Sequence, residues 1–245
     1  MANLILHCGA HAVDRDDVYA TATPEPTASW HPIRHGTLLD LVQDTLAGMG
    51  LNIASEAHAL TRDGSRFFGL LEVRDNNSHA EYSAVVGVRN AHDKAFSAGI
   101  AMGTAVLACD NLCFASDVVL SRKHTIRIAD DLPRLVLTAV GKLGEVRHDQ
   151  DRRIEAYKAK RLTTRTVHDL LVKLVDAGSL PVTCLPGALA QYRQPDHEQY
   201  LTDGRRTAWT LHNAVTHVLR GRNLTELPRR TIAMQGMLDR ACSLN

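Results

Sequence analysis

The chain has 245 residues, of which 44% are apolar and 22% charged, a balance typical of a folded protein rather than a disordered one. This length suits one large domain or two small ones. Its 28 basic and 27 acidic residues nearly cancel, so net charge alone does not indicate a polyanionic partner. Aromatic residues make up only 4%, which argues against an extensive surface of stacked bases.

Five cysteines occur without the even number and regular spacing of a disulfide framework. The N-terminal residues lack the basic segment of a signal peptide, and no uninterrupted apolar run approaches the roughly 20 residues of a membrane span. We therefore expect a soluble cytoplasmic protein without a membrane partner.

Residues 1–35 are predicted to form an irregular N-terminal arm, because the segment from Thr21 to Pro32 is rich in Pro and Thr. Either a flexible arm or an ordered segment that binds a partner would fit this composition. An ordered arm could also bridge the subunits of an oligomer.

An amphipathic helix is expected to begin near Thr37, where Thr37 and Asp40 resemble a capping box, and to end at Gly48 and Gly50. Three strand candidates follow. They are residues 51–60, 67–74 and 82–89, separated by turn-forming segments that include Asp63-Gly64.

A helix of small residues is predicted from about Lys94 to Ala108, with Asp93 favouring its N-terminus. Gly99 and Gly103 would share one helix face and allow close packing on the sheet, or would form the floor of a ligand groove. A further strand would end at Arg122. The core from residue 36 to 130 is therefore predicted to have the order α-β-β-β-α.

Residues 131–245 are predicted to be mainly helical. Helices are expected from Asp131 onward, from Thr166 to Gly178, from Thr207 to Leu219 and from Pro228 to Cys242. The run from Arg147 to Arg161 mixes charges of both signs, as on a solvated helix face. Overall we predict an α+β fold, an antiparallel β-meander packed with helices, with the helical region packed on the core as one domain.

Residues whose side chains could act in catalysis or bind a metal are concentrated between residues 82 and 125. An enzyme would use His92, Asp93, Asn111 and His124 as a polar site, although no P-loop, nucleophile elbow or dinucleotide fingerprint accompanies them. Cys109 and Cys113 could bind zinc, but two cysteines four residues apart are more often small core residues. We therefore predict no metal and no cofactor, and binding rather than catalysis.

Basic residues flank the same segments and offer an anion-binding alternative. The candidate nucleic-acid-binding residues are Arg89, Lys94, Arg122, Lys123 and Arg127. Scattered surface charge would explain them equally well in a chain with this many Lys and Arg residues.

Three motifs resemble those of the phage and plasmid proteins grouped as domain of unknown function 932. They are Val88-Arg-Asn-Ala-His-Asp-Lys-Ala95, Cys109-Asp-Asn111 with Arg122-Lys-His-Thr125, and Thr207-Ala-Trp-Thr-Leu-His-Asn-Ala-Val-Thr216. The family's first motif has the form N-S-H-D-G-S, so this chain departs from it at Ala91, Lys94 and Ala95. The resemblance implies a mobile-element context in a bacterial host cell and no established activity.

The predicted order of a helix, three strands and a small-residue helix also resembles the phage single-strand annealing proteins of the Red-beta, RecT and ERF type. This resemblance implies a homo-oligomeric protein that binds single-stranded DNA and acts in recombination without covalent catalysis. Two alternatives stay open: an interaction protein that modulates a host or defence factor, and an enzyme with the His/Asp/Asn site.

Overall fold

The computed structural model of the chain describes residues 10–74, 82–106, 111–220 and 226–244. Its centre is an antiparallel sheet in which each strand pairs with the next one along the chain. The strands are β1 (Ala10–Val13), β2 (Asn52–Thr61), β3 (Arg66–Arg74), β4 (Tyr82–Ala91), β5 (Ala98–Val106) and β6 (Asn111–Arg122). This meander, followed by a helical C-terminal half, confirms the predicted α+β class.

Helices precede the sheet and follow it. They are α1 (Arg15–Ala20), α2 (His35–Gly48), α3 (Ile128–Gly141), α4 (Leu143–Ala159), α5 (Thr164–Asp176), α6 (Leu185–Arg193), α7 (Ala208–Leu219) and α8 (Leu227–Ala241), with short 3-10 turns at η1 (Val182–Cys184) and η2 (Glu198–Tyr200). In the described ranges, no helix combines the length and apolar character needed to cross a membrane.

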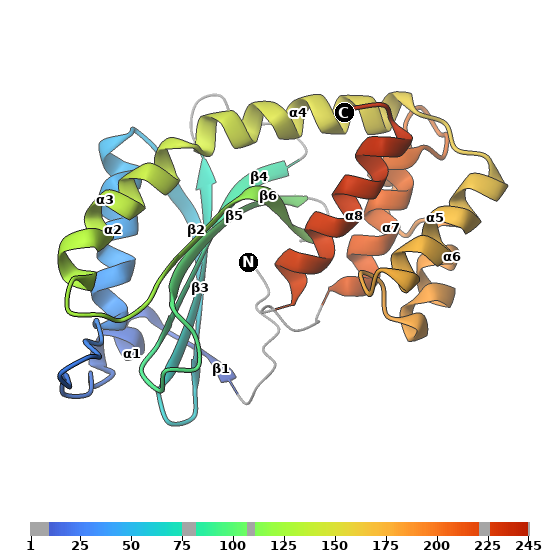
Figure 1. The fold of residues 1–245 in the computed structure, drawn as a ribbon. Helices are drawn as coiled ribbons and strands as arrows, with labels where there is room; N and C mark the ends of the chain where they lie inside the picture. The colour runs from blue at the N-terminus through green and yellow to red at the C-terminus, as the bar shows by residue number, and fades with distance from the viewer. Residues whose placement is uncertain (1–9, 75–81, 107–110, 221–225, 245) are drawn as a thin grey trace.

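Helices cover both faces of the sheet, as Figure 1 shows. On one face, α2 and α3 pack against strand residues such as Phe67, Val86 and Met102. On the other face, the C-terminal helices enclose a second core that includes Phe68 and Val85. The side chains of the neighbouring residues 67 and 68 therefore point into cores on opposite faces of the sheet, as the alternation of a strand requires.

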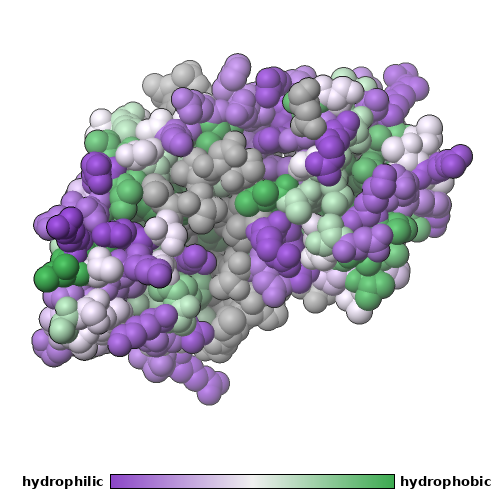
Figure 2. Space-filling model, in the orientation of Figure 1, coloured by the Kyte–Doolittle hydropathy of each residue, from purple (hydrophilic) through white to green (hydrophobic). Residues whose placement is uncertain are grey.

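Helix α4 connects the two cores. Its first turns bury Leu143 and Val146 with α2 and α3, whereas Ile154 and Tyr157 near its other end belong to the second core. A helix of 17 residues spans about 25 Å, enough to pass over the sheet from one layer to the other. In Figure 1 this helix runs along the upper edge of the molecule, where Figure 2 shows mainly hydrophilic side chains.

The segment predicted as a small-residue helix, residues 94–108, is instead strand β5 over Ala98–Val106. Its larger side chains, Ile100 and Met102, alternate with Gly99, Ala101 and Gly103, and this period of two is that of a strand. Ile100 and Met102 are buried against α2 and α3. The prediction gave weight to the four-residue spacing of Gly99 and Gly103, which a strand satisfies equally well. The order α-β-β-β-α is therefore corrected to five consecutive strands between α2 and α3.

The N-terminal segment is more ordered than predicted. It contains β1, which pairs with β2, and α1, which is anchored when Arg15 donates hydrogen bonds to Glu56 and Gln43. Helix α2 begins at His35 rather than at Thr37, and its start shows no side-chain cap. Burial of His35 and Gly36 favours this earlier start over a capping box at Thr37.

Candidate nucleic-acid interface

Two of the motif segments meet at one end of the sheet. Arg89 on β4 pairs with Gly99 on β5, and Arg122 on β6 pairs with Ala98, so the C-terminal ends of β4 and β6 lie on either side of the start of β5. We call residues 89–94 and 122–127, with the adjoining β2–β3 turn at residues 62–65, the strand-end corner. The structure thus brings together segments that are about thirty residues apart in the chain.

Asn90 is the hub of the strand-end corner. It is fully buried, and its side-chain amide nitrogen donates to the carbonyl oxygen of Ile33 and to Nδ1 of His35, both at 2.9 Å. Its oxygen accepts a hydrogen bond of 2.7 Å from Nε2 of His124. One amide therefore joins β4, the start of α2 and the chain after β6, with its hydrogen-bonding capacity nearly filled.

Two histidine rings stack beside this hub. The ring centroids of His35 and His92 are 3.9 Å apart and their planes differ by 7°. His92 donates from Nε2 to the carbonyl of Ile33 at 2.8 Å, and His35 from Nε2 to that of Gly64 at 3.0 Å. Burial lowers the pKa of His35 to about 4, and burial also lowers the pKa of His92 and His124. Burial thus favours the neutral form of these imidazoles, and the bonds of His35 and His92 tie the N-terminal segment to the sheet.

Asp93 shapes the turn between β4 and β5. Its Oδ1 accepts a hydrogen bond from the backbone N–H of Ala95 at 3.0 Å, and its Oδ2 pairs with Arg66 at 2.6 Å. The prediction placed Asp93 at the start of a helix. Because β5 follows, it caps a turn instead.

The proposed catalytic set does not assemble. His92 and His124 both reach the strand-end corner, but Asn111 begins β6 and lies at the opposite end of the sheet, where it pairs with Val106. Eleven residue steps along β6 separate it from Arg122, roughly 35 Å at the rise of a strand. Asp93 is turned to Arg66.

The proposed zinc ligands lie away from the corner too. Cys109 falls outside the described residues, and Cys113 lies on β6 near Asn111, pairing with Thr104. Across the described ranges, no three His, Cys, Asp or Glu residues are grouped as metal ligands.

The basic residues of the strand-end corner fall into two groups. Arg122 pairs with Asp131 and also contacts Thr125, and Arg89 is half-buried, with a pKa lowered by that burial. In contrast, Lys94, Lys123 and Arg127 are exposed and make no ion pair within the described residues. The first two therefore support the corner, and the other three leave their charge available to a ligand.

The prediction missed Arg62, which extends the same cationic edge. It lies in the β2–β3 turn, is exposed, and has no ion pair in the part of the chain that the structure describes. Arg66 pairs with Ala91 across β3 and β4, which places this turn beside the β4–β5 turn. The predicted hairpin at Asp63-Gly64 contained the signal, since antiparallel neighbours return to the same end of a sheet.

Lys94 adopts a left-handed backbone conformation, with a φ of 65°. Residues with a side chain adopt it at a cost of about 1–2 kcal/mol, whereas glycine does so freely. The motif that this chain resembles has glycine at the corresponding position, which explains that pattern physically. This chain instead holds an exposed ammonium group there, at some cost in stability.

Two aromatic rings accompany these cations. The Lys94 ammonium lies 5.0 Å from the centre of the Trp30 ring, and the Arg89 guanidinium lies 5.3 Å from that of Phe96. Both distances suit cation–π attraction. Trp30 and Phe96 are each partly exposed. Because Phe96 also packs on Phe68 against the second core, Trp30 is the ring that adds aromatic surface beside an exposed cation.

In a comparison with known protein families, a family model matches residues 26–243. The family is described as a domain of unknown function, DUF932. The chain belongs to this family. Neither the curated proteins nor the solved structures contain a significant match.

The last motif of the DUF932 resemblance, Thr207 to Thr216, forms the buried helix α7. All residues from Ala208 to Thr216 are buried, and Thr210 donates a hydrogen bond of 2.6 Å to the carbonyl of Tyr200. The Trp209 indole N–H donates to the carbonyl of Gln199, and its ring stacks on His212. In this DUF932 protein the motif is therefore a packing element of the C-terminal half.

Proposed function

We propose that this DUF932 protein binds single-stranded DNA at the strand-end corner, without covalent catalysis. The observation that carries the proposal is Lys94, an exposed cation that has no ion pair within the described residues and is held at a position that favours glycine. Costly backbone conformations persist mainly where they serve a function. With Lys123, Arg127 and Arg62, Lys94 forms a cationic edge that matches the spaced charges of a phosphate backbone.

A single strand fits the corner better than a duplex does. Trp30 lies beside Lys94, and an aromatic ring next to an exposed cation suits bases that are free to unstack. Ile126 is 69% exposed and lies between Lys123 and Arg127 in the chain, which adds apolar surface for a sugar or base. A duplex would present mainly its phosphates to these groups.

The proposal includes no chemical step at the corner. The Nε2–H groups of His35, His92 and His124 are directed to Gly64, Ile33 and Asn90. A role in annealing and recombination, a phage or plasmid setting and homo-oligomers remain predictions. The layout that suggested annealing included a helix where β5 lies, so the present proposal rests on the corner alone.

Fluorescence anisotropy with a labelled oligonucleotide tests the proposal. The wild-type protein should bind single-stranded DNA at low salt more tightly than a duplex of the same sequence. The triple variant Lys94→Gln/Lys123→Gln/Arg127→Gln should bind at least about tenfold more weakly. Lys142→Gln is the matched control, since Lys142 is exposed at the other end of α3. The proposal fails if the wild type shows no binding at low salt.

A further inference from the structure

A pocket of about 510 Å³ opens in the helical C-terminal half, remote in the fold from the strand-end corner. Its walls come from α5, α6, the α4–α5 connection and the turn before α7. The lining residues are Arg161, Leu162, Thr164, Val167, His168, Leu189, Tyr192, Arg193, Gly204, Arg205 and Arg206. Its volume is within the range of small-molecule sites, roughly 300–1,000 Å³.

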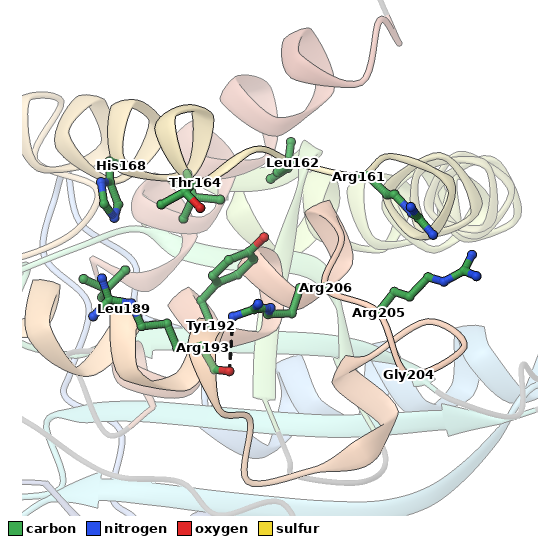
Figure 3. Close-up of a pocket in the computed structure, with 11 residues that line it drawn as sticks. Arg161, Leu162, Thr164, His168, Leu189, Tyr192, Arg193, Gly204, Arg205 and Arg206 are labelled. Atoms are coloured by element: carbon green, nitrogen blue, oxygen red, sulfur yellow. Dashed lines mark hydrogen bonds between the residues drawn. The ribbon is translucent and has the colours of Figure 1, made fainter.

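Among the described residues, four arginines and no carboxylate line this pocket. In Figure 3, Arg161 and Arg205 point toward each other at one end, and Arg193 extends toward the end that holds His168. Arg206 lies between them, 5.8 Å from the Tyr192 ring, and contacts the carbonyl of Arg193. No carboxylate of the described residues forms an ion pair with any of the four.

Several arginines outside the pocket have a carboxylate partner, whereas Arg62 and Arg127 at the strand-end corner have none within the described residues. Arg15, Arg66, Arg122, Arg153 and Arg230 each pair with a carboxylate. Like charges that share one hollow repel one another, and an anionic ligand would offset that repulsion. What distinguishes the pocket is that four arginines share one hollow with no carboxylate among its described lining residues.

Backbone hydrogen bonds fix the main chain that carries Arg161 and Arg205, whose side chains are exposed. Asp203 and Gly204 both have positive φ, 51° and 69°, and Thr202 and Arg205 bond to each other across them. This is the geometry of a two-residue turn that Asp-Gly favours. Arg161 forms a backbone bridge with Thr207, and Ala208 donates to the carbonyl of Lys160 at 2.9 Å. Both sides of the pocket are thus joined by backbone hydrogen bonds.

Helix α5 adds a second anion-favouring feature. Thr164, a lining residue, is the first residue of this 13-residue helix, so its positive dipole end lies at the pocket wall, although the Thr163 hydroxyl already accepts from the Thr166 N–H. Leu162, Val167, Leu189 and Tyr192 supply apolar lining beside the charges. Phosphate groups next to a flat apolar group would match this combination.

We propose that this pocket binds a nucleoside di- or triphosphate, with the guanidinium groups on the phosphates and the apolar wall on the base. One guanidinium group can donate two parallel hydrogen bonds to two oxygens of a phosphate. Several arginines can therefore bind the successive phosphates of one ligand. Because no carboxylate is among the described lining residues, the arginines would neutralise the phosphates and the pocket offers no carboxylate ligand for Mg²⁺. Binding should therefore persist in EDTA.

Isothermal titration calorimetry with ATP in EDTA buffer tests this site on the full chain. The wild-type protein should bind ATP more tightly than AMP, and adenosine should bind most weakly. Arg161→Gln/Arg205→Gln should weaken ATP binding at least about tenfold. Arg165→Gln is the matched control, since Arg165 is exposed next to Thr164 on the first turn of α5 and does not line the pocket. Unchanged thermal unfolding midpoints verify that the variants fold.

Three results would overturn the proposal: no heat of binding with ATP, an equal loss in Arg165→Gln, or equal affinity for ATP and adenosine. A terminal phosphate of a DNA strand offers related chemistry. If a 5′-phosphorylated oligonucleotide binds through Arg161 and Arg205 and displaces ATP with higher affinity, the small-nucleotide assignment is wrong. The pocket variants should leave the strand-end corner intact. Single-stranded DNA binding is measured in parallel, so the proposal for the corner can fail while the proposal for the pocket holds, and the reverse.

Discussion

Asn90 accepts a buried hydrogen bond of 2.7 Å from Nε2 of His124, and this bond joins the end of β4 to the segment that leaves β6. The same amide donates to Ile33 and His35, so one side chain holds three segments of the strand-end corner. The exposed cations Lys94, Lys123 and Arg127 lie in the two segments that the bond between Asn90 and His124 joins. The corner is thus a hydrogen-bonded scaffold with exposed positive charge.

Asn90→Ala should lower the free energy of unfolding by about 3 kcal/mol, because His124, His35 and the Ile33 carbonyl would each lose a buried partner. Urea denaturation followed by circular dichroism measures the change. Asn52→Ala is the control, since Asn52 is exposed at the start of β2, and it should change stability by no more than about 0.5 kcal/mol. Equal effects of the two substitutions would contradict the assignment of Asn90 as a hub.

The stacked histidines make stability depend on pH. Burial lowers the pKa of His35 to about 4, so between pH 6.5 and 4 the unfolded chain binds a proton that the folded chain does not. The contribution of His35 is complete above about pH 6.5 and is lost as the pH falls, by about 2 kcal/mol at pH 5. Protonation of Nδ1 would also break the bond from Asn90.

Urea titrations at pH 7, 6 and 5 check this dependence. His212, whose pKa burial also lowers to about 4, contributes in the same direction. Comparison with His35→Gln isolates the part due to His35: the variant should be less stable at pH 7 and should lose less stability between pH 7 and 5. Parallel losses in both proteins would show that His35 is not a source of the dependence.

Two substitutions of Lys94 distinguish its effect on stability from its effect on DNA binding. Lys94→Gly should raise the free energy of unfolding by up to about 1 kcal/mol, since glycine adopts the left-handed conformation without strain. Lys94→Ala keeps the strain and should give no such gain. Both variants remove the ammonium group and should weaken single-stranded DNA binding to the same degree. If Lys94→Gly instead lowers stability as Lys94→Ala does, the contact with Trp30 outweighs the backbone strain.

The sequence predicted the parts of the fold whose periodicity is unambiguous. The hairpin signal at Asp63-Gly64 and the alternating runs around it indicated the meander, and the apolar spacing after Asp131 indicated the helical half. Strand β5 was missed because its residues are small, and small residues at every second position also satisfy a helical spacing. Ile100 and Met102 are buried on one face of β5, and this burial favours a strand. The burial depends on packing in the folded chain and cannot be seen in the local sequence.

The candidate site was predicted in part for a similar reason. The motifs indicated the residues of the corner, but sequence alone does not separate Arg122, which an acidic partner neutralises, from Lys123 and Arg127. Nor does it show that Asn111 lies at the far end of β6. The arginine pocket had a local signal, the Asp203-Gly204 turn before Arg205 and Arg206. Its other walls come from residues 161–193 and become neighbours only in the folded chain.

The salt dependence of single-stranded DNA binding tests the central claim most directly. Each phosphate contact contributes about 0.7 to the slope of the logarithm of the binding constant against the logarithm of salt concentration. The triple variant Lys94→Gln/Lys123→Gln/Arg127→Gln should therefore show a slope shallower by about 2 than the wild type and the Lys142→Gln control. Identical slopes in all three proteins would contradict the claim that the strand-end corner binds the DNA backbone.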